Sequence, residues 1–181
     1  MKHPARSLLA ALTVGTALFA FPAWAEELGQ VQFTFDGEDR TWFTMTYDAG
    51  GTPRPSARVR SSSMGETVDI DAFPEADSPT LERLSLTWMY PRSFARSNPP
   101  DYTRVFGFSI TWLPGMVTGP QWVSRNEQLD LTTGDLEGDE GHVTGTFTAE
   151  LCYVEELYGD PDESTCQPIS GTIDTRIGRR E

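Results

Sequence analysis

The feature that most restricts the fold of this chain is a two-residue alternation of apolar and polar side chains. It is clearest in six segments after residue 25, which are residues 30–35, 42–47, 84–90, 106–112, 143–153 and 169–177. A period of two is typical of half-buried β-strands, because successive side chains point to opposite faces of a sheet. Helical spacing is poor throughout the same region, so the sequence predicts an all-β protein.

The number and spacing of the expected strands predict the architecture. The chain of 181 residues has 16 glycines and 13 prolines, which divide it into short segments separated by turns. Roughly eight or nine strands without a long helix predict a single antiparallel β-sandwich of jelly-roll type, with a closed β-barrel of lipocalin type as the alternative. We expect residues 26–181 to form this one domain.

The first 25 residues have the pattern of a cleaved signal peptide. Lys2 and Arg6 form a basic start, an apolar run follows from Ser7 to Pro22, and Ala23-Trp24-Ala25 fits an A-x-A cleavage site. The apolar run is too short to cross a hydrocarbon core comfortably. We therefore expect a mature chain that begins at Glu26, is periplasmic or secreted, and has no membrane span.

The charge of the expected mature chain excludes several partners and chemistries. Without Lys2 and Arg6, the chain keeps 12 arginines, no lysine and 27 acidic residues, which is a formal charge of −15. We expect no nucleic-acid partner and no anionic membrane partner, because both attract basic patches. The lack of lysine excludes Schiff-base chemistry and a P-loop.

Residues that usually carry catalysis or bind metals are scarce in the sequence. His142 is the one histidine after residue 25, and no G-x-S-x-G motif accompanies it. One histidine and two cysteines lack the ligand number and spacing of a zinc site. We therefore interpret His142 as a solvated turn residue, and we expect no cofactor and no catalytic residue.

An acidic turn is the best candidate for a metal site. Asp135, Glu137 and Asp139 alternate as in the first half of a calcium-binding loop, since calcium prefers several oxygen ligands. The match then fails, because an EF-hand loop has glycine at its sixth position and glutamate at its twelfth, where this chain has Glu140 and Thr146. We interpret the turn as solvated, with the three carboxylates as a weak calcium candidate.

Two tryptophans are the candidates for an exposed ligand surface. Trp42 lies on the threonine-bearing face of its strand, and Trp122 lies two residues after Pro120 in an expected loop. Exposed aromatic side chains are informative because they often mark a binding site. Trp88 and Trp112 share the parity of apolar neighbours, so we expect them in the core.

The two cysteines predict a disulfide between Cys152 and Cys166. An exported chain meets an oxidising compartment, where a pair of cysteines is expected to join. If the two lie opposite each other in an antiparallel hairpin, one register satisfies both of its faces. Each bulky inward residue then meets a glycine, in the pairs Phe147 with Gly171 and Ile173 with Gly145. Outward, the same register pairs hydroxyl groups, Thr148 with Ser170 and Thr146 with Thr172.

The function predicted from the sequence is a binding or structural module with an unknown protein or glycan ligand. It depends on the lack of a catalytic constellation in a fold that commonly presents binding loops. The alternative is a glycan hydrolase that uses two carboxylates, since 27 acidic residues offer many pairs. Arg54, Arg58 and Arg60 form a local cluster, which we expect to pair with the protein's own acids.

The closing part of the chain carries one resemblance. Residues 141–152 and 166–175, with their G-x-V-x-G-x-F pattern, resemble the last hairpin of exported β-sandwich proteins. The resemblance covers roughly a fifth of the chain after residue 25 and implies no activity, so no functional residue is carried over from it.

Overall fold

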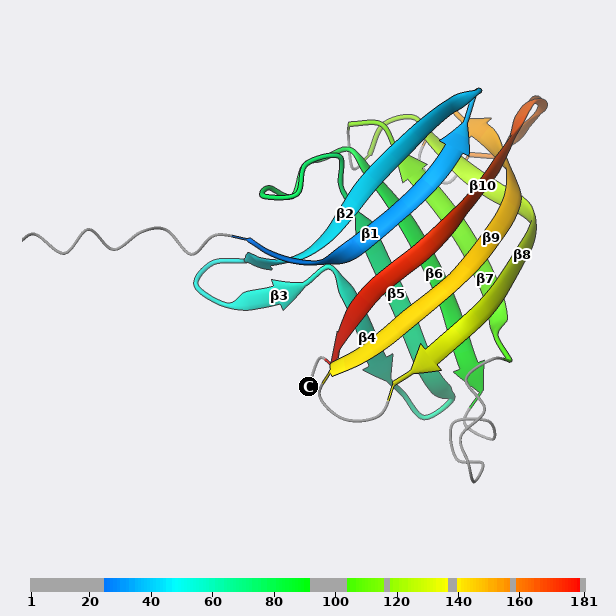
Figure 1. Cartoon of the computed structure of the whole chain (residues 1–181). Helices are drawn as coiled ribbons and strands as arrows, with labels where there is room; N and C mark the ends of the chain where they lie inside the picture. The colour runs from blue at the N-terminus through cyan, green and yellow to red at the C-terminus, as the bar shows by residue number, and fades with distance from the viewer. Residues whose placement is uncertain (1–24, 92–103, 116–117, 137–139, 157–158, 180–181) are drawn as a thin grey trace, which may run out of the picture.

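The computed structural model describes residues 25–91, 104–115, 118–136, 140–156 and 159–179, and these ranges form ten β-strands (Figure 1). The strands are β1 (Glu26–Phe35), β2 (Glu38–Asp48), β3 (Pro53–Pro55), β4 (Ala57–Ser61), β5 (Gly65–Ala72), β6 (Arg83–Pro91), β7 (Phe106–Leu113), β8 (Gln121–Asp135), β9 (Glu140–Val154) and β10 (Asp162–Arg179). The all-β prediction is confirmed. Residues 1–24 of the expected signal peptide lie outside the described ranges, and those ranges hold no helix suited to crossing a membrane.

All ten strands belong to one sheet. Their order is β3-β2-β1-β10-β4-β5-β6-β7-β8-β9, and β9 also pairs with β10, so the sheet curls back on itself. Every pairing is antiparallel except a short parallel contact between β10 and β4. The structure is thus one curved sheet with a partly closed ring. The described strands do not form the two separate sheets of the predicted sandwich. The alternative prediction, a sheet closed into a full ring, agrees with the structure only in part.

The long strand β10 closes the ring. One of its edges pairs first with β1 and then, through Gly178 and Arg179, with β4. Its other edge pairs with β9 along most of its length. Figure 1 shows β1, β10, β9 and β8 crossing in front of β5, β6 and β7. Buried side chains from both of these walls form one hydrophobic cluster, which includes Trp88, Phe147 and Ile173.

The turn between β1 and β2 decides which side chains of β2 enter the core. Asp36 and Gly37 have φ angles of 53° and 74°, which suits a two-residue hairpin turn of type I′. This turn places Val31 opposite Trp42. Because Val31 faces the core, Trp42 does so too, and its side chain is buried.

The other face of β2 is covered by a different segment. Phe43 exchanges backbone hydrogen bonds with Phe73, at 2.7 and 2.9 Å, and the rings of Tyr47 and Phe73 lie 6.4 Å apart. Met45 is buried there as well. Both faces of β2 are therefore partly covered, which a simple alternation of apolar and polar residues does not reveal.

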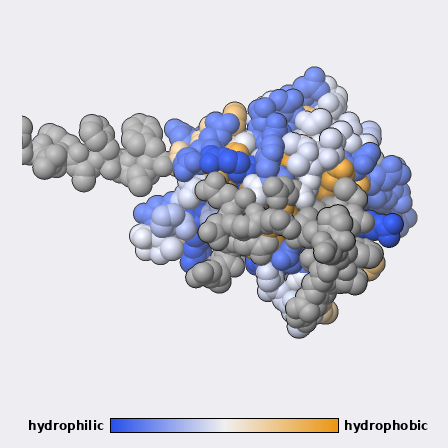
Figure 2. Space-filling model, turned by 60° about the horizontal axis from the view of Figure 1, so that its bottom comes forward, coloured by the Kyte–Doolittle hydropathy of each residue, from blue (hydrophilic) through white to orange (hydrophobic). Residues whose placement is uncertain are grey.

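The described residues that are visible in Figure 2 have a mostly hydrophilic or neutral surface, with small hydrophobic areas. The large apolar side chains that are strongly exposed in the described ranges are Met64, Leu81 and Phe106. Single exposed apolar residues are normal on proteins, so they do not by themselves mark a site.

Candidate binding surface

Neutral polar side chains cover the outward face of four adjacent strands, β2, β1, β10 and β9. The alternation in β1, β10 and β9 turns apolar residues toward the core and hydroxyl and amide groups outward, and β2 adds Thr41, which lies opposite Gln32. We call this surface the hydroxyl face, and it consists of Gln32, Thr34, Thr41, Thr146, Thr148, Ser170 and Thr172.

The pairing of the strands arranges these side chains in two rows that cross them. Thr34, Ser170 and Thr148 lie opposite one another on β1, β10 and β9, and form the first row. The second row consists of Gln32, Thr172 and Thr146 on the same three strands. The register that the cysteines predicted for β9 and β10 is confirmed by these pairs.

A shallow groove lies along the rows. Its volume is about 480 Å³, and Asp39, Arg40 and Thr41 of β2 line it together with both rows. A second groove of about 350 Å³ shares the second row and continues to Gln30, Thr144 and Asp174. The hydroxyl face is therefore hollowed over a distance of several strands.

Most hydroxyl groups of this face make no hydrogen bond to the described residues. Thr34 is engaged, because its Oγ1 donates to Asp39 Oδ1 at 2.5 Å. Within the described part of the chain, the hydroxyls of Thr146, Thr148, Ser170 and Thr172 have no such protein partner. A hydroxyl group both donates and accepts hydrogen bonds, so these groups are available to water or to a ligand.

The floor of the groove is tightly packed from below. Gly171 lies opposite Phe147, and a Cβ atom at this glycine would stand 2.6 Å from Phe147 Cζ and 2.3 Å from the carbonyl oxygen of Gln32. The glycine thus makes room for the buried ring, as the sequence predicts. This packing fixes the backbone that carries Ser170 and Thr172.

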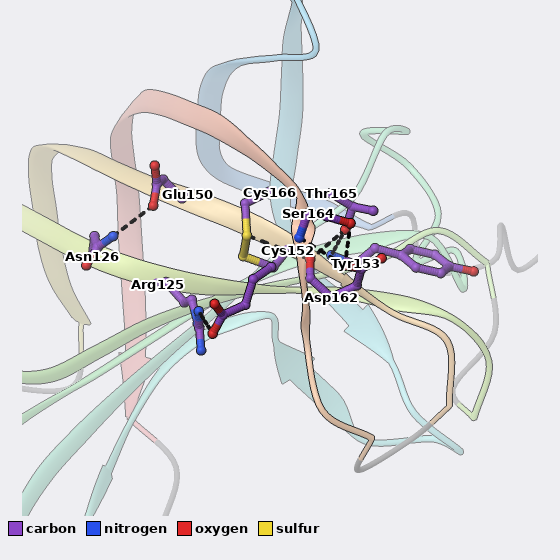
Figure 3. Close-up of a disulfide and its surroundings, with 10 residues drawn as sticks. Arg125, Asn126, Glu150, Cys152, Tyr153, Asp162, Ser164, Thr165 and Cys166 are labelled. Atoms are coloured by element: carbon purple, nitrogen blue, oxygen red, sulfur yellow. Dashed lines mark hydrogen bonds and ion pairs between the residues drawn. A yellow bond between two sulfur atoms is a disulfide. The ribbon is translucent and has the colours of Figure 1, made fainter.

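The disulfide lies at one end of the same two strands. Cys152 and Cys166 are joined, with their Cα atoms 4.0 Å apart, which confirms the predicted bridge (Figure 3). Beside it, Asp162 accepts hydrogen bonds from the hydroxyl and the backbone N–H of Ser164, at 2.7 and 2.9 Å. These two hydrogen bonds lower the pKa of Asp162, the one from the Ser164 hydroxyl most strongly. The Cys152–Cys166 disulfide is consistent with an oxidising compartment outside the cytoplasm.

The two tryptophans predicted to form a ligand surface lie in one aromatic cluster. Trp42 contacts Trp112 with ring centroids 6.0 Å apart, and Phe35 contacts both Trp112 and Trp122, at 4.9 and 5.3 Å. Trp122 is half-buried and lies in β8 rather than in a loop. Trp42 is only 5% exposed, so its predicted exposure is wrong. The two-residue turn at Asp36 is the reason, because it sets the register of β2.

The opposite wall of the sheet carries charged side chains instead. We call this surface the ion-pair face, and it consists of Arg58, Arg60, Asp69, Asp71 and Arg83. Arg60 Nε donates to Asp69 Oδ2 at 2.6 Å, and this hydrogen bond raises the pKa of the guanidinium. Arg58 Nη1 donates to Asp71 Oδ2 at 3.4 Å. The expected pairing of Arg58 and Arg60 with the protein's own acids is confirmed, while Arg54 lies exposed on β3.

Two hydroxyl groups of β6 that border the ion-pair face are engaged. Ser85 Oγ donates to Asp71 Oδ1 at 2.6 Å, and Thr87 Oγ1 donates to Asp69 Oδ1 at 3.2 Å. The carboxylates of Asp69 and Asp71 are mostly buried by these neighbours. Most polar groups of this surface are therefore engaged by its own contacts, although Arg58 Nε and Arg83 Nε are buried without a hydrogen-bond partner among the described residues.

Of His142 and the three carboxylates of the acidic turn, only His142 has a described side chain. His142 lies in β9 rather than in a turn, and its Nε2 lies 2.8 Å from Asp174 Oδ1, with both side chains about half exposed or more. Glu137, Asp139 and the side chain of Asp135 lie outside the described residues. Across the part of the chain that is described, no group of three or more metal-ligating side chains occurs.

The hydroxyl face was not singled out from the sequence, although one signal for it is present. Thr144, Thr146 and Thr148 alternate along β9, and the outward positions opposite them on β10 are also short and polar. Compared with known proteins, the chain matches no family model, no curated protein and no solved structure. Function must therefore be argued from the chemistry of the surface.

Proposed function

We propose that this chain is an exported binding protein, periplasmic or secreted, that holds a ligand on the hydroxyl face and performs no catalysis. One observation carries the proposal. Two rows of hydroxyl and amide groups, most of them without a hydrogen-bond partner among the described residues, line a groove of about 480 Å³. Groups left available in a concave site suit the recognition of a polar ligand.

Export is supported by two independent features. The first 25 residues have the pattern of a signal peptide, and the disulfide suits an oxidising compartment. The test is the N-terminal sequence of the protein isolated from outside the cytoplasm of its host, which we expect to begin at Glu26. Full-length protein recovered from the cytoplasm would contradict export.

The alternative of a glycan hydrolase has less support at this surface. Such an enzyme needs two carboxyl groups about 5–10 Å apart on either side of the sugar bond. The described lining of the larger groove has one carboxylate, Asp39, and it is engaged by Thr34. The larger groove therefore suits binding better than hydrolysis.

The test of binding uses a double variant of the second row. Thr146→Val and Thr172→Val together remove two exposed hydroxyl groups and keep the β-branched shape that suits a strand. We screen the mature protein on arrays of glycans and of unstructured peptides, and expect the double variant to lose the signal. Thr111→Val is the matched control, because Thr111 points outward on β7 beyond the groove.

A second screen separates binding from catalysis. The mature protein is incubated with a panel of glycosidase substrates, and no turnover is expected. Turnover that disappears in Asp39→Asn would overturn the proposal of a binding protein without catalysis. Binding that survives in the Thr146→Val, Thr172→Val variant would remove the hydroxyl face as the site.

A further inference from the structure

We infer that the ligand of the hydroxyl face is an uncharged glycan chain that lies across the strands, between the two rows. The inference rests on the proposed function and adds the class of ligand and its direction. The direction follows from the register, because the first row and the second row both run from β1 through β10 to β9. Neighbouring strands are about 4.8 Å apart, and outward residues repeat every 6.8 Å or so along a strand. An extended chain of sugars therefore meets a new pair of side chains at every strand.

The chemistry of the rows matches that of sugars. Each threonine or serine hydroxyl donates one hydrogen bond and accepts others, and the Gln32 amide does both as well. Sugar hydroxyls have the same double capacity, so either partner can serve as the donor. The threonine methyl groups add small apolar contacts for the C–H faces of the sugar rings.

The charges at the groove are engaged by the protein itself. Asp39 accepts from Thr34, and Arg40 donates from Nη2 to Glu38 Oε2 at 2.8 Å. The Arg40 guanidinium also lies 4.7 Å from the centre of the Trp112 ring. In the second groove, Asp174 lies against His142. A polyanion would therefore meet no available cation in the described lining of the grooves. The formal net charge of the chain, −13, would also repel it, so both observations argue against a polyanionic ligand.

A peptide strand is the main competing ligand, and the topology disfavours it. Peptides commonly bind to sheets by adding a strand at a free edge. β1 and β10 are each paired on both sides along both rows, and β9 pairs with β10 and β8. The backbone groups beneath the rows are therefore taken, and recognition depends on side chains.

The extent of the hollow favours a polymer over a single sugar. The two grooves share Gln32, Thr146 and Thr172, and together they reach from Thr41 on β2 to Thr132 on β8. A single sugar ring would contact two or three of these side chains. A longer chain contacts more of them at once, so we expect the affinity to rise with chain length.

The experiment compares three probes on the mature protein by calorimetry. The probes are neutral β-linked oligosaccharides of increasing length, uronic acid oligosaccharides of the same lengths, and an unstructured peptide rich in serine and threonine. We expect the neutral series alone to bind, with Kd falling as the chain lengthens and unchanged by added salt. Thr146→Val with Thr172→Val should weaken binding at least about tenfold, as lost hydrogen bonds predict. Thr111→Val should leave the Kd unchanged.

The outcomes separate this inference from the proposed function. Binding of the peptide or of the uronic acid series, lost in the second-row variant, would overturn the neutral glycan and keep the hydroxyl face as a binding site. If the neutral oligosaccharides bind equally well at every chain length, the inference of an extended glycan chain lying across the strands is overturned. Binding that the second-row variant leaves intact, or no binding to any probe, would overturn both the inference and the proposed function.

Discussion

The hydroxyl face and the ion-pair face use the same kinds of side chain in opposite ways. On the ion-pair face, Ser85 and Thr87 donate to the carboxylates of the neighbouring strand. On the hydroxyl face, Ser170 and Thr172 have no protein partner within the described ranges. The polar groups of the ion-pair face bond to one another and stabilise the sheet, whereas those of the hydroxyl face are available to water or a ligand.

The difference follows from what the register places opposite each hydroxyl. On β5, Asp69 lies between β4 and β6 and accepts hydrogen bonds from both sides, from Arg60 of β4 and from Thr87 of β6. On β10, Ser170 lies between Thr34 and Thr148, which are neutral. Hydrogen bonds to a charged group are stronger than those between neutral groups. We therefore expect the ion-pair face to respond to substitution as a structural unit and the hydroxyl face to respond mainly in binding.

The largest effect is expected from loss of the disulfide, which supports the end of the hydroxyl face. The bridge spans 14 residues, and a loop of that size contributes about 3 kcal/mol by restricting the unfolded chain. Replacing both Cys152 and Cys166 by alanine should lower the free energy of unfolding by about this amount in urea titrations. Wild-type protein in reductant is the control and should behave alike. A loss well below about 1 kcal/mol would mean that the strand ladder alone orders this end.

The next effect tests the floor of the groove. In Gly171→Ala, the new methyl group would meet the carbonyl oxygen of Gln32 at 2.3 Å, and a backbone atom moves less easily than a flexible side chain. Overpacking of this kind costs about 2–3 kcal/mol. Ser170→Ala, on the next residue of the same strand, should change the stability by less than about 0.5 kcal/mol. Equal stabilities for the two variants would show that the floor can relax.

The two faces differ most clearly in how much one aspartate contributes to the free energy of unfolding. Asp69→Ala removes the acceptor of Arg60 and Thr87 on the ion-pair face and should cost about 1–2 kcal/mol, since Arg60 is half exposed and recovers part of its hydration. Asp39→Ala on the hydroxyl face loses one contact with Thr34 and should cost less than about 0.5 kcal/mol. Urea titrations at low and high salt should show the difference shrinking with salt. A difference that is absent at low salt would contradict the assignment of the two faces.

The local part of this arrangement could be predicted from the sequence. Cys152, Cys166 and the glycines opposite bulky residues determine the register of β9 and β10, because one register satisfies all of them. The pairing of Arg58 and Arg60 with acids is also local, since β4 and β5 form a hairpin. The position of Trp42 was predicted wrongly, because the Asp36–Gly37 turn, and not the alternation alone, determines which face of β2 is inward.

The hydroxyl face itself could not be predicted, because it joins the two ends of the chain. Thr34 lies opposite Ser170, and nothing in the sequence near either residue indicates that β1 will lie beside β10. The threonines of β9 are visible as an alternation, but their neighbours across the sheet come from long-range pairing. A binding surface made from several strands therefore depends on topology as well as on composition.

A pair of serine-to-alanine variants compares the two faces directly, because each variant removes one hydroxyl oxygen from one face. Ser85→Ala removes a hydroxyl that donates to Asp71 at 2.6 Å, and a lost hydrogen bond to a charged, mostly buried group costs about 1.5 kcal/mol. Ser170→Ala removes a hydroxyl that has no hydrogen-bond partner in the described part of the chain. The change should leave stability unchanged and weaken the binding of a ligand in the groove. Urea titration and calorimetry on both variants measure the two effects. Loss of stability in Ser170→Ala, or loss of binding in Ser85→Ala, would reverse the roles of the two faces.

The smallest expected effect is a dependence of stability on pH at the disulfide end. The hydroxyl and the N–H of Ser164 hold the pKa of Asp162 below its ordinary value in the folded chain. As the pH falls below about 4, the unfolded chain takes up this proton first, so the contribution of Asp162 is present above that pH and is lost with further acidification. Asp162→Asn should therefore be less stable than wild type at neutral pH, by a small margin because the carboxylate is exposed, and the margin should close as the pH falls below about 4. Asp160→Asn is the control, since Asp160 makes no side-chain hydrogen bond to the described residues. A margin that widens on acidification would show that Ser164 does not favour the charged form of Asp162.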